Sequence, residues 1–296
     1  MERGNKKVIC PSGIDLEQLV PVNGNKFLFH YTTYSSALGI LLSQQMRLSS
    51  LANMNDPLEF EDHRRDGLVF HGNPSNEDLA KWIHDFVEAV KEKNRSVRLA
   101  SFAMDMPLNN PPKGAQDNLY NNLCKGWARS RMWAQYADKH RGICLIFDKE
   151  NLIKAFKDEF KEDSCEALCK AVEYTNDLDP LKDALCKSCK SLLTTEKINF
   201  LFQKCQDFRD EQEFRLLLIN KKLKDAKELV SFSIADSLCG VISGVNFPKE
   251  DRPSLERAME SCNPEIRYFS IRWEYGVPNL YDYAHSRELI KRVLSK

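Results

Sequence analysis

The sequence lacks the short motifs that mark many nucleotide-binding and hydrolytic sites. It contains no glycine-rich phosphate loop, no G-x-S-x-G sequence and no H-E-x-x-H sequence. These motifs place phosphates against backbone amides, a serine on a sharp turn, and two histidines on one zinc ion. Their absence argues against nucleotide kinases, dehydrogenases, serine hydrolases and zinc metalloproteases.

The chain also lacks an excess of charge of either sign and a long hydrophobic run. Lys plus Arg and Asp plus Glu both number 43 in 296 residues, so no global field favours nucleic acid or an anionic membrane. No apolar run is long enough to span a bilayer, and the first residues lack the hydrophobic segment of a secretory signal. We therefore expect a cytoplasmic globular protein without membrane contact.

Ten cysteines in such a protein are expected to be reduced thiols. Cys165 and Cys169 form one closely spaced pair, and Cys186 and Cys189 form another. Only the second pair has the spacing of a typical zinc-ligand pair, so we predict no metal site.

Residues 27–60 are predicted to form a strand, a helix, a second strand and a polar turn. His30, Tyr31 and Thr32 stand where the first strand gives way to the helix. Polar side chains beside the free amides of a helix N-terminus are suited to holding a phosphate or a ribose. The second strand carries Arg47, and the turn after it carries three further candidates for the same site, Asn55, Asp56 and Glu59.

Residues 211–219 are predicted to form a strand with Glu211, Glu213 and Arg215 on one face. The arginine would keep both carboxyl groups ionised, and such a carboxylate can stabilise a developing positive charge. The alternative is a structural ion pair. On a predicted helix at 127–140, Met132, Trp133 and Tyr136 share a face that we expect to pack in the core rather than to stack on a base.

Predicted helices and strands are intermixed along the chain, without a repeat or an obvious linker. We therefore predict one α+β domain over residues 26–296, with a mixed or antiparallel central sheet flanked by helices, after a loosely ordered arm at 1–25.

Four segments of the sequence resemble a bacterial family of unknown function, DUF2971. They are FHYT (29–32) leading into RLSS and NDPLE, then MWAQYADKHRG (132–142), DEQEFR (210–215) and CGVISG (239–244). Members of this family often occur in bacterial defence neighbourhoods, which implies a defence or toxin effector and defence-system partner proteins.

The opening strand–helix–strand unit with His30, followed by a late E-x-E strand, also resembles the ADP-ribosyltransferases. This resemblance implies a fold of that type and a cofactor site for NAD made by His30, Tyr31, Thr32, Arg47 and Arg215. It implies that Glu213, or Glu211 as the alternative, is catalytic. Ser101-Phe102 is the nearest match to the middle motif of that superfamily, and Tyr136 is an aromatic candidate.

We therefore expect an NAD-consuming ADP-ribosyltransferase-like enzyme that acts on the nicotinamide–ribose bond, with an unknown nucleic acid or protein as acceptor. One alternative is a non-catalytic sensor that binds a nucleotide or a partner. Another is a metal-dependent nuclease built on Asp56, Glu59, Glu211 and Glu213.

Overall fold

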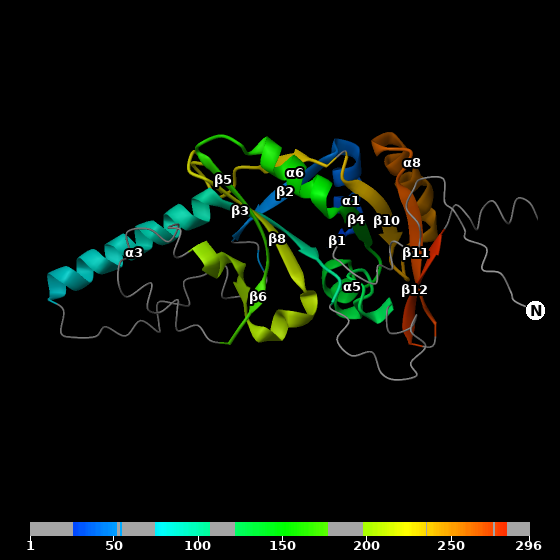
Figure 1. Cartoon of the computed structure of the whole chain (residues 1–296), viewed down its shortest axis with the longest axis horizontal. Coiled ribbons are helices and arrows are strands. Elements are labelled where there is room, and N and C mark those ends of the chain that lie inside the picture. The colour runs from blue at the N-terminus through cyan, green and yellow to red at the C-terminus, as the bar shows by residue number, and fades with distance from the viewer. Residues whose placement is uncertain are drawn as a thin grey trace, which may run out of the picture. The chain divides into compact units, whose positions relative to one another are not determined.

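The computed structural model describes residues 26–51, 54, 75–106, 122–176, 198–234, 236–274 and 276–282. The predicted arm at 1–25 lies outside them. The described residues form an α+β fold with a mixed, mostly antiparallel sheet and helices, as predicted (Figure 1). None of the helices found in these ranges combines the length and apolar character needed to span a membrane.

The chain divides into two compact units. Unit 1 draws on residues 1–45, 102–155 and 233–296, and unit 2 draws on 46–101 and 156–232. The chain passes from one unit to the other four times, and each passage falls inside or at the end of a strand or helix. An interleaved pair of units has no linker between them, which is why none is visible in the sequence.

Unit 1 contains a mixed sheet in the order β12-β11-β10-β4-β1. These strands are β1 (Phe27–Thr32), β4 (Ile143–Asp148), β10 (Leu238–Ser243), β11 (Arg267–Glu274) and β12 (Val277–Asp282). Only β10 and β11 pair in parallel, and the end of β3 (Val97–Ala103) joins β1 through Ala103 opposite Phe29. The sequence of β4, ICLIFD, is an apolar run because the strand is buried on both faces.

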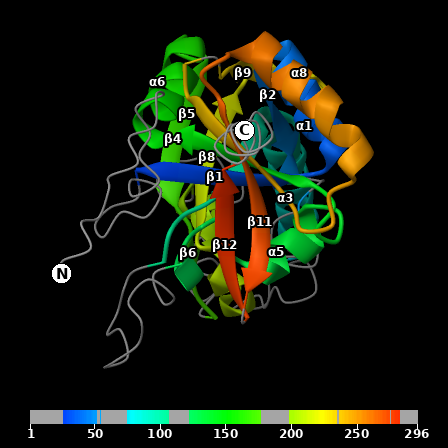
Figure 2. The ribbon, with the colours of Figure 1, turned by 90° about the vertical axis from the view of Figure 1, so that its right-hand side faces the viewer.

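The helices of unit 1 follow from local sequence signals. They are α1 (Tyr34–Ser43), α5 (Ser130–Tyr136), a short 3-10 helix η5 (Lys249–Asp251) and α8 (Arg252–Cys262), while α6 (Lys149–Glu159) begins in this unit. The Thr33 hydroxyl caps α1 by accepting from the Ser36 amide at 3.3 Å, and Gln44 ends the helix with φ 54°. Helices α1 and α8 lie side by side (Figure 2), joined where the Tyr34 hydroxyl donates to the Asp251 carbonyl at 3.2 Å.

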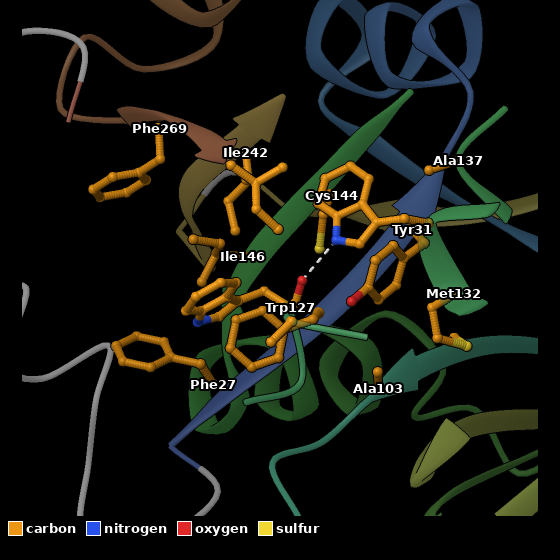
Figure 3. Packing of buried hydrophobic residues seen from close by; sticks show 14 residues of the cluster. Phe27, Tyr31, Ala103, Trp127, Met132, Ala137, Cys144, Ile146, Ile242 and Phe269 are labelled. Atoms are coloured by element: carbon orange, nitrogen blue, oxygen red, sulfur yellow. Dashed lines mark hydrogen bonds between the residues drawn. The ribbon is translucent and has the colours of Figure 1, made fainter. Parts of the chain in front are cut away.

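The core of unit 1 is a cluster of aromatic and aliphatic side chains (Figure 3). Phe27, Phe29 and Tyr31 contribute one face of β1, and Trp127 and Trp133 pack against them. The Trp133 indole nitrogen donates to the Trp127 carbonyl at 2.7 Å, so its polar atom is satisfied inside the core.

The prediction that the α5 aromatic face is core is confirmed. Met132 and Trp133 are buried within the cluster. Tyr136 is partly buried and packs against the same residues.

Unit 2 contains a second set of strands in the order β5-β8-β3-β2-β9. With β3 they are β2 (Gln45–Ser50), β5 (Cys165–Ala171), β8 (Glu213–Asn220) and β9 (Val230–Ser233). The long helix α3 (Asn76–Ser96) leads directly into β3. A separate parallel ladder joins β6 (Glu173–Tyr174) to β7 (Gln203–Lys204), flanked by the 3-10 helices η3 (Ile198–Phe202) and η4 (Gln206–Glu211).

The strand predicted at 211–219 starts two residues later than expected. Glu211 is the last residue of η4, and Gln212 has a left-handed conformation with φ 44°. The Gln212 side chain donates to the Arg209 carbonyl at 2.7 Å, which fixes this turn before β8 begins at Glu213. The prediction that Glu211 shares a strand face with Glu213 and Arg215 was therefore wrong, because the turn interrupts the alternation.

Candidate functional site

Glu213 and Arg215 form a buried bidentate ion pair on one face of β8. The Arg215 Nε donates to Glu213 Oε1 at 2.6 Å, and Nη2 donates to Oε2 at 3.0 Å. The third guanidinium nitrogen, Nη1, donates to the Leu201 carbonyl at 2.6 Å. Glu213 is 3% exposed and Arg215 is 1% exposed. The two parallel charge-assisted hydrogen bonds therefore compensate both groups for the loss of hydration.

Lys204 of β7 connects both glutamates of the motif. Its Nζ lies 2.8 Å from Glu211 Oε2 and 3.0 Å from Glu213 Oε2, and it stands 5.0 Å above the Phe208 ring. Glu211 and Lys204 are buried as well. The two glutamates of the motif are thus brought together by Lys204 rather than by a shared strand face. Among the described residues, two carboxylates here face two cations, so their charges offset one another.

Two hydroxyl groups complete the surroundings of Glu213. The Ser101 side chain of β3 hydrogen-bonds to the Glu213 carboxylate. The Glu213 backbone N–H donates to the Tyr174 hydroxyl at 2.8 Å. Burial raises the pKa of Tyr174 well above its ordinary value of 10.0, so the phenol stays protonated.

The charge state of Glu213 follows from these contacts. Burial alone raises its pKa, but the Arg215 and Lys204 charges and the hydrogen bonds from Arg215 and Ser101 outweigh burial and lower the pKa from 4.5 to about 2. The group is therefore a fixed negative charge at neutral pH. It can stabilise a neighbouring positive charge, but it is not poised to exchange a proton.

Sequence reasoning missed Lys204 and Tyr174. Both belong to the β6–β7 ladder, where Tyr174 lies opposite Lys204. A lysine in the polar stretch QKCQD gives no sign of burial, and a two-residue strand is too short for an alternating pattern. Neither residue had a signal that could have identified it.

The residues predicted to hold a cofactor on β1 lie in unit 1. The Tyr31 ring is in the core, and its hydroxyl donates to the Gly126 carbonyl at 2.7 Å. Burial raises the pKa of Tyr31 well above its ordinary value. Thr32 is also buried. His30 points to the other face of β1, is half-buried, and has its ring 5.5 Å from that of Phe102.

Some of the other predicted site residues lie in one of the two units, and the rest lie outside the described part of the chain. Arg47 lies exposed on β2, in unit 2. Asn55, Asp56 and Glu59 lie outside the described residues. On β3, Ser101 contacts Glu213 whereas the next residue, Phe102, contacts His30. Consecutive strand residues face opposite ways, so these two contacts use opposite faces of β3.

Two of the segments that carry the resemblance, 132–142 and 239–244, meet in unit 1 around a left-handed turn. Asp138, Lys139 and His140 have φ of 44°, 52° and 68°, conformations that are costly for residues with a Cβ. The turn is held by tight backbone contacts on both sides. The Gly244 amide donates to the Gly142 carbonyl at 3.0 Å, and a Cβ on Gly244 would lie 2.1 Å from the His140 carbonyl oxygen. Burial lowers the pKa of His140, so its ring is biased toward the neutral form.

The described residues offer little for a metal ion. Among them, no group of three or more His, Cys, Asp or Glu side chains is arranged to hold one. Cys165 and Cys169 lie on β5, while Cys186 and Cys189 lie outside the described ranges. Glu211 and Glu213, two members of the predicted nuclease set, already bind Lys204 and Arg215, which would compete with a divalent cation for their oxygens.

Comparison with known families identifies one match. Residues 132–216 match the model of a family described as "Protein of unknown function (DUF2971)". The matched segment takes in the left-handed turn, Lys204 and the Glu213–Arg215 pair, and it confirms the resemblance found from the motifs over these residues. Searches of curated proteins and of solved structures found no match.

Proposed function

We propose that the chain is an NAD-consuming ADP-ribosyltransferase-like enzyme. In this proposal Glu213 stabilises the positive charge that develops on the ribose as the bond to nicotinamide breaks. The observation that carries the proposal is the hydrogen bond between Ser101 and the Glu213 carboxylate. The resemblance assigns the middle motif and the late Glu to the nicotinamide end of the cofactor, and Ser101-Phe102 is the nearest match to that motif. A contact between Ser101 and Glu213 supports this assignment.

The electrostatics of Glu213 also support a role in stabilising charge. With its pKa lowered to about 2, the carboxylate is ionised throughout the physiological range. An oxocarbenium-like ribose needs a fixed negative charge close by, and a fixed charge costs no reorganisation when the bond breaks.

The proposal assigns separate roles to the residues around the cofactor. Arg47, exposed on β2 in the same unit as Glu213, would bind the pyrophosphate. His30 lies in unit 1 with its ring against Phe102, so the proposal does not assign the adenosine ribose to it. Tyr31 and Arg215 receive supporting roles instead, because their polar atoms bind Gly126 and Glu213.

The test is the release of nicotinamide from NAD by the purified full-length protein, with bacterial lysate supplied as acceptor. Glu213→Gln removes the charge and keeps the shape, and we expect a rate loss of about a hundredfold or more. Ser101→Ala should reduce the rate by a smaller factor, because it removes one supporting hydrogen bond. Glu162→Gln is the matched control, since this carboxylate also pairs with a lysine but is 66% exposed.

Circular dichroism spectra of each variant would separate a loss of folding from a loss of chemistry. Undiminished turnover by folded Glu213→Gln protein would refute the catalytic role. If labelled NAD is transferred to the lysate, digestion of the product with protease or nuclease would identify the acceptor as protein or nucleic acid. A role as a defence effector would then be tested on that acceptor.

A second candidate function is a non-catalytic module that binds a nucleotide or a partner. The observation that favours it is the closure of the charged cluster, in which both glutamates are 3% exposed and bonded to cations. This function predicts stoichiometric binding of NAD in calorimetry with no nicotinamide produced. In that case the Glu213–Arg215 pair would be architecture.

A further inference from the structure

Among the described residues, strand β5 of unit 2 has a strand neighbour on one side only, and we call its other side the free edge. It pairs with β8 on one side, and no other described strand pairs with it (Figure 1). The Val172 amide donates to the Glu213 carbonyl at 2.8 Å, and this bond shows which residues of β5 turn their backbone groups toward β8. In an antiparallel pair, alternate residues turn their backbone groups toward the partner strand. Ala167 and Cys169 therefore turn their N–H and C=O groups away from β8, toward the free edge.

The charges on β5 are complementary when two copies of the strand are placed side by side and antiparallel. In CEALCKA, Leu168 is the centre, Ala167 and Cys169 flank it, and Glu166 and Lys170 stand at equal distances beyond them. Glu166 and Lys170 are both exposed. The Lys170 Nζ donates to Asn199 Oδ1 at 3.1 Å and lies 5.6 Å from the centroid of the Phe202 ring, and at this exposed position it can exchange these contacts for a carboxylate of a second copy. Two such strands placed antiparallel about Leu168 would set Glu166 of each copy opposite Lys170 of the other.

The directions of the backbone N–H and C=O groups of β5 are compatible with the same register. With Leu168 at the centre, Ala167 of one copy lies opposite Cys169 of the other, and both turn their backbone groups outward. These positions can exchange hydrogen bonds as a regular antiparallel ladder does. The two Leu168 residues and the two Glu166–Lys170 pairs then occupy the closer, non-hydrogen-bonded positions, where cross-strand side chains interact most strongly.

We propose that two copies of this chain pair through the free edges of β5, antiparallel and centred on Leu168. Charged residues on an edge strand usually prevent such pairing. Here the two charges are of opposite sign and symmetrically placed, so they repel misaligned registers and attract in this one. The symmetric contact closes after two copies. It is independent of the function proposed above.

The charges provide the first test, by sedimentation velocity over a series of protein concentrations. The wild type should form a dimer. Glu166→Lys sets two ammonium groups opposite each other at both ends of the interface and should weaken the dimer about tenfold or more. The double variant Glu166→Lys/Lys170→Glu restores both pairs with their signs exchanged and should recover dimerisation. A wild type that stays monomeric, or a dimer that is insensitive to Glu166→Lys, would overturn the proposal.

A disulfide test fixes the register. At the two-fold centre, the Cα atoms of position 168 in the two copies should be about 4.5 Å apart, within the roughly 4.4–6.8 Å that a disulfide spans. Leu168→Cys should therefore give an oxidised dimer whose peptide map joins position 168 to itself. Glu166→Cys is the control, because its two thiols would be about 13 Å apart. Cross-linking at 166 and not at 168 would exclude the proposed register.

Discussion

At the scale of single residues, the charge of Glu213 depends on groups that distant segments bring to it. Arg215 belongs to the same strand, whereas Lys204 and Ser101 come from β7 and β3. Removing any one of them leaves a buried charge with fewer partners, which is expensive in a medium where water is excluded.

This coupling predicts a particular acid sensitivity. The pKa of Glu213 is lowered in the folded protein, so its ionisation stabilises the fold above its ordinary pKa of 4.5, and this stability is lost as pH falls toward about 2. Urea unfolding measured between these pH values should show a steeper loss of stability for the wild type than for Glu213→Gln. The variant will be less stable at neutral pH, so the comparison is between slopes. Parallel pH profiles would show that Glu213 carries no shifted titration.

At the scale of elements, the strained turn at 138–140 depends on close approach of the backbone at Gly244. A Cβ there would lie 2.1 Å from the His140 carbonyl oxygen and 2.7 Å from its carbon, and backbone atoms can move only by distorting the turn. Gly244→Ala should therefore destabilise the protein by about 1–3 kcal/mol, the usual cost of overpacking.

Gly39 in α1 provides the opposite case. A Cβ there would meet no atom within 4 Å. Gly39→Ala should therefore be stabilising by about 0.5–1 kcal/mol, because it replaces a mid-helix glycine. Thermal unfolding of both variants checks the pair, and equal shifts for the two would contradict the packing argument.

Elements set by local signals were predictable from the sequence. The strand–helix–strand opening follows from the Thr33 cap, from helical spacing, and from the polar residues that end α1 at Gln44. The faces of Glu213 and Arg215 follow from strand alternation. Glu211 was misplaced because the left-handed Gln212 depends on a side-chain contact with Arg209 that no periodicity encodes. The burial of Lys204 results from tertiary packing, and the residues next to it in the sequence do not indicate it.

At the scale of the whole molecule, interleaving should make the two units unfold together. The chain passes between them four times, and β3 continues from one to the other at residues 101 and 102. Unfolding of unit 2 would therefore free the ends of the segments that build unit 1. Trp127, Trp133 and Trp273 belong to unit 1, so Trp82→Phe gives a background in which tryptophan fluorescence reports on that unit alone.

In this background, Leu217→Ala tests the coupling. Leu217 is fully buried in the core of unit 2 with Leu99 and Ile219, and its truncation should cost about 2–5 kcal/mol. If unfolding is cooperative, the fluorescence midpoint in urea should fall as far as the midpoint seen by circular dichroism. Leu42→Ala, at a side chain that is 64% exposed, is the control and should leave both midpoints nearly unchanged. A fluorescence midpoint that stays at the wild-type value while circular dichroism reports early unfolding would mean that unit 1 keeps its aromatic core without unit 2.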